Sequence, residues 1–190
     1  MDKTVASKLY LETLGTGIPA ASPGKSLLMM EACVWCLRNQ NHTNGVKLKV
    51  IENDKKERFY TVHWPKNLDI KAIFRTYNQE DAIEYGAEAL AFLLVREQTN
   101  FTVIERAVTS TGIDYWLGFK NINRNHIFHK AARLEISGIL AENKGNTVTS
   151  RINIKQKQTQ PTDHTLPVYI IVVEFSKPWA KMVLKNVNSR

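Results

Sequence analysis

Two acidic residues of this sequence, Asp114 and Glu135, stand where carboxylates could do chemistry. Asp114 follows Gly112-Ile113 at the expected start of a strand, a position from which a side chain can face a cleft. Glu135 interrupts the otherwise apolar pattern of residues 132–138, and a buried carboxylate without a partner is costly. Carboxylates that converge from adjacent strands suit a hard cation that prefers oxygen ligands, such as Mg²⁺ or Mn²⁺. The two acids therefore predict a metal-binding pair.

The period of a strand decides which side chains accompany Glu135. Alternate residues share one face, so Arg133 and Ser137 should point the same way as Glu135, and the apolar residues between them should point to the core. Arg133 is thereby a candidate catalytic cation beside the acids. A simpler alternative stays open, in which Glu135 pairs with Arg133 or Lys130 on a solvated sheet face and Asp114 only stabilises a turn.

Further charged residues could complete such a site. Glu105, in the strand expected before Asp114, is a candidate third metal ligand, and Glu88, in the preceding helix, could hold a metal or a water. The candidates for contacts with a phosphate backbone are basic residues near the acids: Lys130, Arg151, Lys155 and Lys157. A solvated helix face would carry the same run of charge, so both readings of the basic residues after position 150 stay open.

The overall charge favours a polyanionic partner. The 190 residues contain 26 Lys and Arg against 18 Asp and Glu, a formal net charge of +8. Positive charge raises the local concentration of polyanions, and each neutralised phosphate releases counterions. We expect nucleic acid as the partner, DNA rather than RNA, and leave open whether the chain forms a homodimer or joins a larger protein complex.

The elements that must hold these residues follow from hydrophobic periodicity and from breakers. Before residue 79 the pattern predicts helices over 4–14 and 23–38, a β-hairpin over 47–64 and a short helix or loop over 68–77. After it, the pattern predicts a helix, three strands, a helix and a strand: 79–97, 101–108, 113–119, 132–140, 146–160 and 168–175. The expected fold class is therefore α/β (α+β) with a mixed central sheet. Residues 1–78 form an N-terminal helical and hairpin extension and residues 79–190 form the core, together one compact unit.

This order of elements, with Gly112-Ile113-Asp114 and Arg133-Leu-Glu-Ile-Ser137, resembles the PD-(D/E)xK, or restriction-endonuclease-like, nuclease superfamily. The resemblance covers about residues 79–176 and implies a core of order α-β-β-β-α-β. It implies that Asp114 is the family's aspartate, that Glu135 is its second acid, and that the two hold Mg²⁺ or Mn²⁺ for phosphodiester hydrolysis. A role in defence against foreign DNA would fit this superfamily.

The match departs from the family at the catalytic lysine, where this chain has Ser137. Serine cannot supply a cation, so Arg133, Lys130 or a helix residue such as Lys155 or Lys157 would have to substitute. Two alternatives therefore stay open beside a nuclease. One is a catalytically inactive module of the same fold that binds nucleic acid or scaffolds a complex. The other is an unrelated α+β domain in which both acids are structural.

Several function classes are disfavoured by composition. No apolar run approaches the roughly 18 residues that a membrane span needs, and the first twenty residues lack the pattern of a signal peptide. The only cysteines are Cys33 and Cys36, too few for a disulfide framework or a four-thiolate zinc site. We expect a cytoplasmic protein with no membrane partner.

Overall fold

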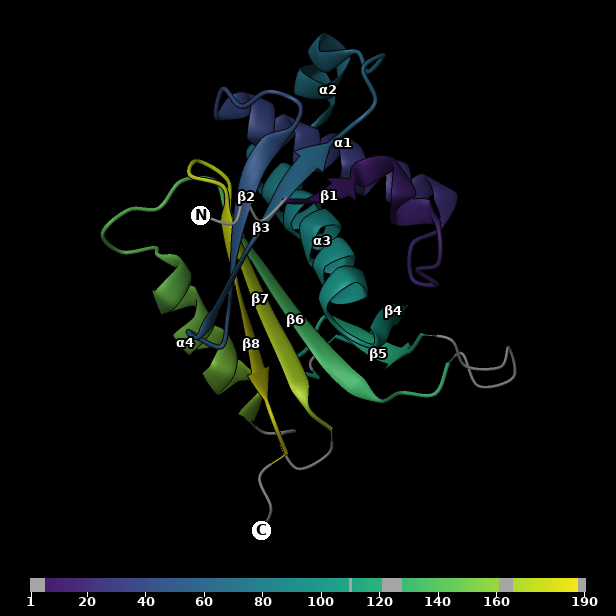
Figure 1. Cartoon of the computed structure of the whole chain (residues 1–190), viewed down its shortest axis with the longest axis vertical. Helices are drawn as coiled ribbons and strands as arrows, with labels where there is room; N and C mark the ends of the chain where they lie inside the picture. The colour runs from purple at the N-terminus through teal and green to yellow at the C-terminus, as the bar shows by residue number, and fades with distance from the viewer. Residues whose placement is uncertain (1–5, 110, 121–127, 161–165, 188–190) are drawn as a thin grey trace.

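One mixed sheet of eight strands runs through the part of the chain that the computed structural model describes, residues 6–109, 111–120, 128–160 and 166–187. The strand order is β1-β3-β2-β8-β7-β6-β5-β4, and helices lie on both of its faces (Figure 1). The strands are β1 (Ser7–Tyr10), β2 (Val46–Glu52), β3 (Lys56–His63), β4 (Phe101–Arg106), β5 (Tyr115–Phe119), β6 (Ala132–Ile139), β7 (Val168–Glu174) and β8 (Trp179–Lys185). The predicted mixed α/β class is confirmed.

The helices begin where the sequence supplies capping residues. They are α1 (Pro23–Asn39), α2 (Ile70–Thr76), α3 (Gln79–Gln98) and α4 (Val148–Gln158). The side chains of Ser22, Asp69, Asn78 and Thr147 each accept a hydrogen bond from a backbone N–H of the first turn of α1, α2, α3 and α4, respectively. Such caps satisfy donors that have no partner inside the helix. No helix among the described residues is long and apolar enough to cross a membrane.

The first element departs from the prediction. Residues 4–14 were expected to form a helix, but β1 pairs in parallel with β3 and is followed by the 3₁₀ helix η1 (Leu11–Gly15). Leu9, Leu11 and Leu14 are all buried by this path. Tertiary pairing with β3 therefore overrides the local helical spacing of these leucines.

Strand β8 has no counterpart in the sequence-based prediction. It pairs antiparallel with β7 and parallel with β2, so it links the hairpin β2–β3 to the strands that follow residue 79. Its alternation is real, since Ala180 and Met182 are buried, but Lys181 lies between them and Lys185 ends the strand. The whole sheet is thereby continuous across residue 78.

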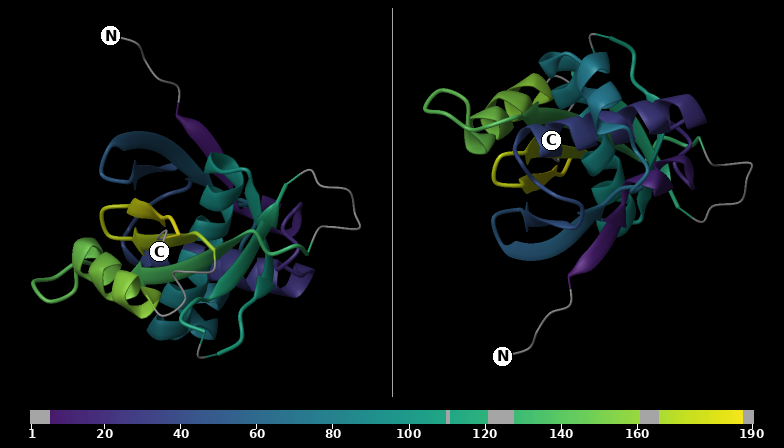
Figure 2. Two further views of the ribbon diagram at one scale, coloured as in Figure 1. Left: turned by 90° about the horizontal axis from the view of Figure 1, so that it is seen from below. Right: turned by 90° about the horizontal axis from the view of Figure 1, so that it is seen from above.

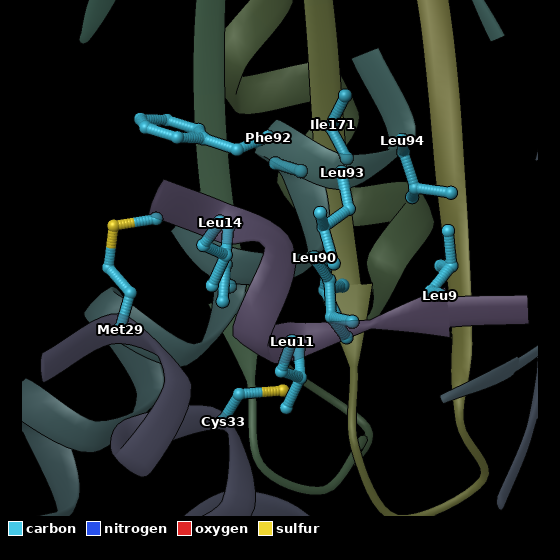
Figure 3. Packing of buried hydrophobic residues seen from close by; sticks show 14 of the residues in the cluster. Leu9, Leu11, Leu14, Met29, Cys33, Leu90, Phe92, Leu93, Leu94 and Ile171 are labelled. Carbon is cyan, nitrogen blue, oxygen red and sulfur yellow. The ribbon is translucent and has the colours of Figure 1, made fainter. Parts of the chain in front are cut away.

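Each face of the sheet has its own core. On one face, Leu90, Phe92, Leu93 and Leu94 of α3 pack with Leu9, Leu11, Leu14, Met29, Cys33 and Ile171 (Figure 3). On the opposite face α4 packs on β7 through Val148 and Ile152, against Val168, Ile170 and Val172. Both faces of β7 are therefore buried, which explains its nearly continuous β-branched sequence.

A glycine sets how closely α3 approaches the strand that carries Glu135. A Cβ at Gly138 of β6 would lie 2.6 Å from both the carbonyl oxygen and Cγ2 of Ile83, and 3.0 Å from Cβ of Ala87. Backbone atoms cannot move aside as a flexible side-chain end can. Close packing of α3 on β6 thus depends on the absence of a side chain at position 138.

We predict that Gly138→Ala lowers the free energy of unfolding by about 1–3 kcal/mol, the usual range for overpacking. Urea denaturation monitored by tryptophan fluorescence measures the change. Gly24→Ala is the matched control, because a Cβ at Gly24 meets no atom within 4 Å. This substitution also replaces glycine by a better helix former. Equal stabilities of Gly138→Ala and the wild-type chain would contradict the packing argument.

Candidate active site

Asp114 lies in the connection between β4 and β5 and is fixed against β6. Its backbone N–H donates to the carbonyl oxygen of Leu134 at 3.0 Å, and its Oδ2 accepts from the backbone N–H of Ile136 at 2.8 Å. The loop before it needs Gly112, which has a φ of 73° and lies so near the end of α4 that a Cβ would be 2.8 Å from the carbonyl oxygen of Gln158. The Asp114 carboxylate is thereby held on the residues that flank Glu135.

Glu135 is fully buried under α4. Its Oε1 accepts hydrogen bonds from Nζ of Lys155 at 2.5 Å and from Nε2 of Gln158 at 3.0 Å. Its Oε2 is buried and accepts no hydrogen bond from the described residues, and a side-chain hydrogen bond with Asp114 favours the protonated form of Glu135. An orphaned carboxylate oxygen beside a second carboxylate is the arrangement that a cation would complete.

The surroundings of Glu135 change its acidity. Burial raises the pKa of this carboxyl most, and the nearby charge of Asp114 raises it further, while Lys155 acts in the opposite direction. The result is a pKa of about 7, compared with an ordinary value of 4.5. Two carboxyl groups that repel each other share a proton or bind a cation to relieve the repulsion, so Glu135 at neutral pH is poised between these states.

A cleft of about 700 Å³ opens beside this pair. Its walls come from the first half of α3, the end of β6 with the residues that follow it, and α4. Asp114, Ser137, Arg151 and Lys155 are among its lining residues. Asp114 also lines a second hollow of about 490 Å³, together with Arg106, so that the aspartate borders open space on two sides.

Glu88 of α3 also lines the cleft, and it is almost completely buried. Tyr115 donates its hydroxyl hydrogen to Oε1 of Glu88 at 2.6 Å, and the ammonium of Lys25 forms an ion pair with Oε2. The charge of Glu88 raises the pKa of Tyr115, although burial contributes most to that rise. A second neutralised carboxylate thus faces the cleft from the side opposite α4.

Two of the sequence-predicted residues lie at a strand edge and pair with each other. Glu105 of β4 forms an ion pair with Lys130 at 3.2 Å, and both side chains are about half exposed. The ammonium of Lys130 also lies 4.6 Å from the centre of the Trp116 ring. Neither residue is among those that line the cleft.

The remaining basic candidates separate from one another. Arg133 is buried, and its Nε donates to the carbonyl oxygen of Leu166 at 2.8 Å. Lys157 is exposed, and neither of these two residues lines the cleft. Arg151 does line it, with its Nε donating to Oδ1 of Asn146 at 2.6 Å. The structure thus brings Asp114, Glu135, Lys155 and Arg151 together.

The donor set fits a small divalent cation with few protein ligands. No group of three or more His, Cys, Asp or Glu side chains suited to metal binding occurs among the described residues. Mg²⁺, however, is commonly bound through one or two carboxylates, with water and substrate phosphates as its other ligands. Asp114 and the free oxygen of Glu135 match that requirement.

The position of Lys155 on α4, beside Glu135, could be predicted only in part from the sequence. Arg151, Lys155 and Gln158 recur at spacings of four and three, which puts them on one stripe of α4. That stripe faces the sheet at Glu135, but which stripe faces it depends on packing. The pairing of Glu88 with Tyr115 and Lys25 joins residues 27 and 63 positions away and has no local sequence signal.

Comparison with known proteins gives no family: no protein-family model matches the chain, and no curated protein matches it.

The raised pKa of Glu135 predicts how stability varies with pH. Because its folded-state pKa of about 7 exceeds the ordinary 4.5, the folded chain keeps a proton that the unfolded chain releases between these values. The contribution of the Glu135 carboxyl to the free energy of unfolding is therefore fully present below pH 4.5 and is lost as the pH rises to about 7. Asp114 and Lys155 are the charged groups that face it.

We predict that Glu135→Gln changes the free energy of unfolding, relative to the wild type, more favourably at pH 8 than at pH 5. The two differences, both measured in a chelator, should themselves differ by on the order of 1–3 kcal/mol. Urea denaturation of wild type and variant at both pH values measures the difference. Glu105→Gln is the control, because this residue has a half-exposed side chain and pairs with Lys130 away from Glu135. A Glu135→Gln chain that loses more stability at pH 8 than at pH 5 would refute the prediction.

Proposed function

We propose that this chain is a metal-dependent nuclease that hydrolyses phosphodiester bonds, with a restriction-endonuclease-like core made of α3, β4, β5, β6, α4 and β7. The observation that carries the proposal is the contact of Lys155 with Glu135, because it supplies the cation that Ser137 cannot. Asp114 and Lys155 line a cleft wide enough for a nucleotide, and Glu135 is buried behind them in contact with Lys155.

The order of elements supports the same proposal. A helix, three strands, a helix and a strand follow one another from residue 79 to residue 174, and β6 and β7 are parallel neighbours. Asp114 precedes the second of these strands and Glu135 lies inside the third. Strand β8 and the hairpin β2–β3 would then be additions to that core at its β7 edge.

In the proposed site, Asp114 and Glu135 hold Mg²⁺ or Mn²⁺ beside the scissile phosphate. When bound, such a metal orients the phosphate and lowers the pKa of a water that attacks it. Lys155 leaves its ion pair with Glu135 and stabilises the negative charge that develops on the phosphate. Arg151, on the same helical stripe and in the same cleft, steadies a neighbouring phosphate and fixes the register of the strand being cut.

A second candidate function is a non-catalytic nucleic-acid-binding module. The burial of Glu135 favours it, since this residue is fully buried, is not among those that line the cleft, and already forms an ion pair with Lys155. A module would keep the pair permanently closed. A nuclease would open the pair when metal and phosphate bind, and the two functions therefore differ in whether metal binds at all.

We predict that Asp114→Asn and Glu135→Gln each reduce cleavage of DNA in Mg²⁺ or Mn²⁺ by at least about 10³-fold, because each removes a metal ligand. Lys155→Ala should reduce it by about 10²-fold or more, as loss of an electrostatic stabiliser does. Plasmid, linear and single-stranded substrates, incubated with a panel of divalent metals and resolved on gels, measure the rates.

Lys157→Ala is the matched control for the lysine, because Lys157 lies on α4 outside the cleft. It should cleave at the wild-type rate, as should Ser137→Ala. A wild-type chain that binds nucleic acid but cuts none of these substrates would leave the module as the function. Full activity of Asp114→Asn would exclude the metal-dependent mechanism.

We also predict direct metal binding that does not depend on turnover. Titration calorimetry with Mn²⁺ should give one site per wild-type chain, and Asp114→Asn and Glu135→Gln should each lose it. Glu105→Gln should bind as the wild type does, because Glu105 is engaged by Lys130 away from the cleft. Loss of binding in Glu105→Gln would mean that the ligand set is different.

A further inference from the structure

A second surface of the molecule combines exposed aromatic rings with lysines. It lies on the α4 side of the sheet, on β1, β2 and β3, and we call it the hairpin face. Its side chains are those that alternate with the buried ones on these strands: Lys8, Tyr10, Lys47, Lys49, Phe59, Thr61 and His63. Viewed along the strands, the hairpin β2–β3 continues the sheet beyond the part that α4 covers (Figure 2).

The strand register arranges these side chains in rows. Tyr10 lies opposite His63, and their ring centroids are 5.2 Å apart. Lys8 and Lys47 both lie opposite Thr61, from its two sides. Four residues along β3 separate the His63 row from Phe59, which is about 13 Å at the rise of a strand. Two aromatic positions are therefore spaced far enough apart to hold different ligand groups.

The two aromatic side chains of the hairpin face are accessible to a ligand. Tyr10 is 40% exposed and Phe59 is 39% exposed. The ammonium of Lys47 lies 4.1 Å over the Phe59 ring, which is a cation–π contact on a flexible stem. A planar group that stacks on Phe59 would displace this ammonium, which could then reach an anion attached to that group.

Charge on the hairpin face is unbalanced at one end. Near the turn of the hairpin, Lys49 pairs with Glu57 at 2.6 Å and Lys181 of β8 pairs with Asp54 at 2.7 Å. At the other end, neither Lys8 nor Lys47 forms an ion pair with a carboxylate in the described part of the chain. The positive charge that is left over is therefore next to Tyr10 and Phe59.

We infer that the hairpin face binds single-stranded nucleic acid, with unpaired bases stacked on Tyr10 and Phe59 and phosphates on Lys8 and Lys47. Stacking on aromatic residues needs exposed base faces, which a duplex hides and a single strand offers. An acidic peptide would use the lysines but would have no use for the rings. The ligand class is that of the proposed function, on which this inference therefore rests, while the surface is separate from the cleft.

The test is fluorescence anisotropy with a labelled mixed-sequence DNA single strand of about 12 nucleotides, within the site sizes of such surfaces. A chelator prevents cleavage. Tyr10→Ala and Phe59→Ala should each weaken binding at least about fivefold, and the conservative Tyr10→Phe should keep it. Phe74→Ala is the matched control, because Phe74 has the same 39% exposure as Phe59 but lies on α2, and it should bind as the wild type does.

The lysines have a separate readout. Lys8→Ala and Lys47→Ala should each lower the slope of log affinity against log salt by about 0.7, the value for one phosphate contact on a single strand. Lys71→Ala is the control, because Lys71 is exposed and lies on α2. Wild-type binding that favours duplex over single strand would overturn the inference, as would unchanged binding by Tyr10→Ala and Phe59→Ala.

Failure of this inference and failure of the proposed nuclease are distinguishable. Binding without any cleavage by the wild type would refute the nuclease alone. Cleavage that requires Asp114, together with variants of Tyr10 and Phe59 that bind like the wild type, would refute the hairpin face alone.

Discussion

The burial of a carboxylate at Glu135 is the constraint on which the surrounding structure depends. An ionised group that is fully removed from water must be compensated, and here α4 provides the compensation through Lys155 and Gln158. The compensation is incomplete, since the second oxygen accepts no hydrogen bond from the described residues, and burial together with Asp114 keeps the pKa raised. A purely structural acid would gain from a complete set of partners, whereas a site that admits a cation must leave a ligand oxygen free.

The geometry around this acid is enforced by close approaches of backbone. Gly112 lets the loop that bears Asp114 pass beside the end of α4, and Gly138 lets α3 lie directly on β6. Asp114 in turn accepts from the N–H of Ile136, so the two carboxylates are tied to one short stretch of β6. Rigid elements therefore position the pair, and the side chain of Lys155, which is partly exposed, is the member that can move.

Much of this could be predicted from sequence because it depends on local patterns. Apolar periodicity with capping residues is enough to predict α1, α3 and α4, and alternation or a run of β-branched residues is enough to predict the hairpin and β4 to β7. Strand β8 could not be predicted because lysines interrupt its apolar residues. Strand β1 could not be predicted because the spacing of its leucines fits a helix, and only the pairing with β3 makes it a strand. The acids could be predicted as a pair because Glu135 lies inside a strand and Asp114 directly precedes the neighbouring one, but the partner that reaches them depends on how α4 rotates over the sheet.

Two regions of the same face of the sheet hold their lysines in different surroundings. Over β6, β7 and β8 the α4 side is covered, and charge there must be paired, which is why Lys155 meets Glu135. Over β1, β2 and β3 the same side is exposed at Lys8, Tyr10, Lys47 and Phe59, and lysines there can remain without carboxylates because water solvates them.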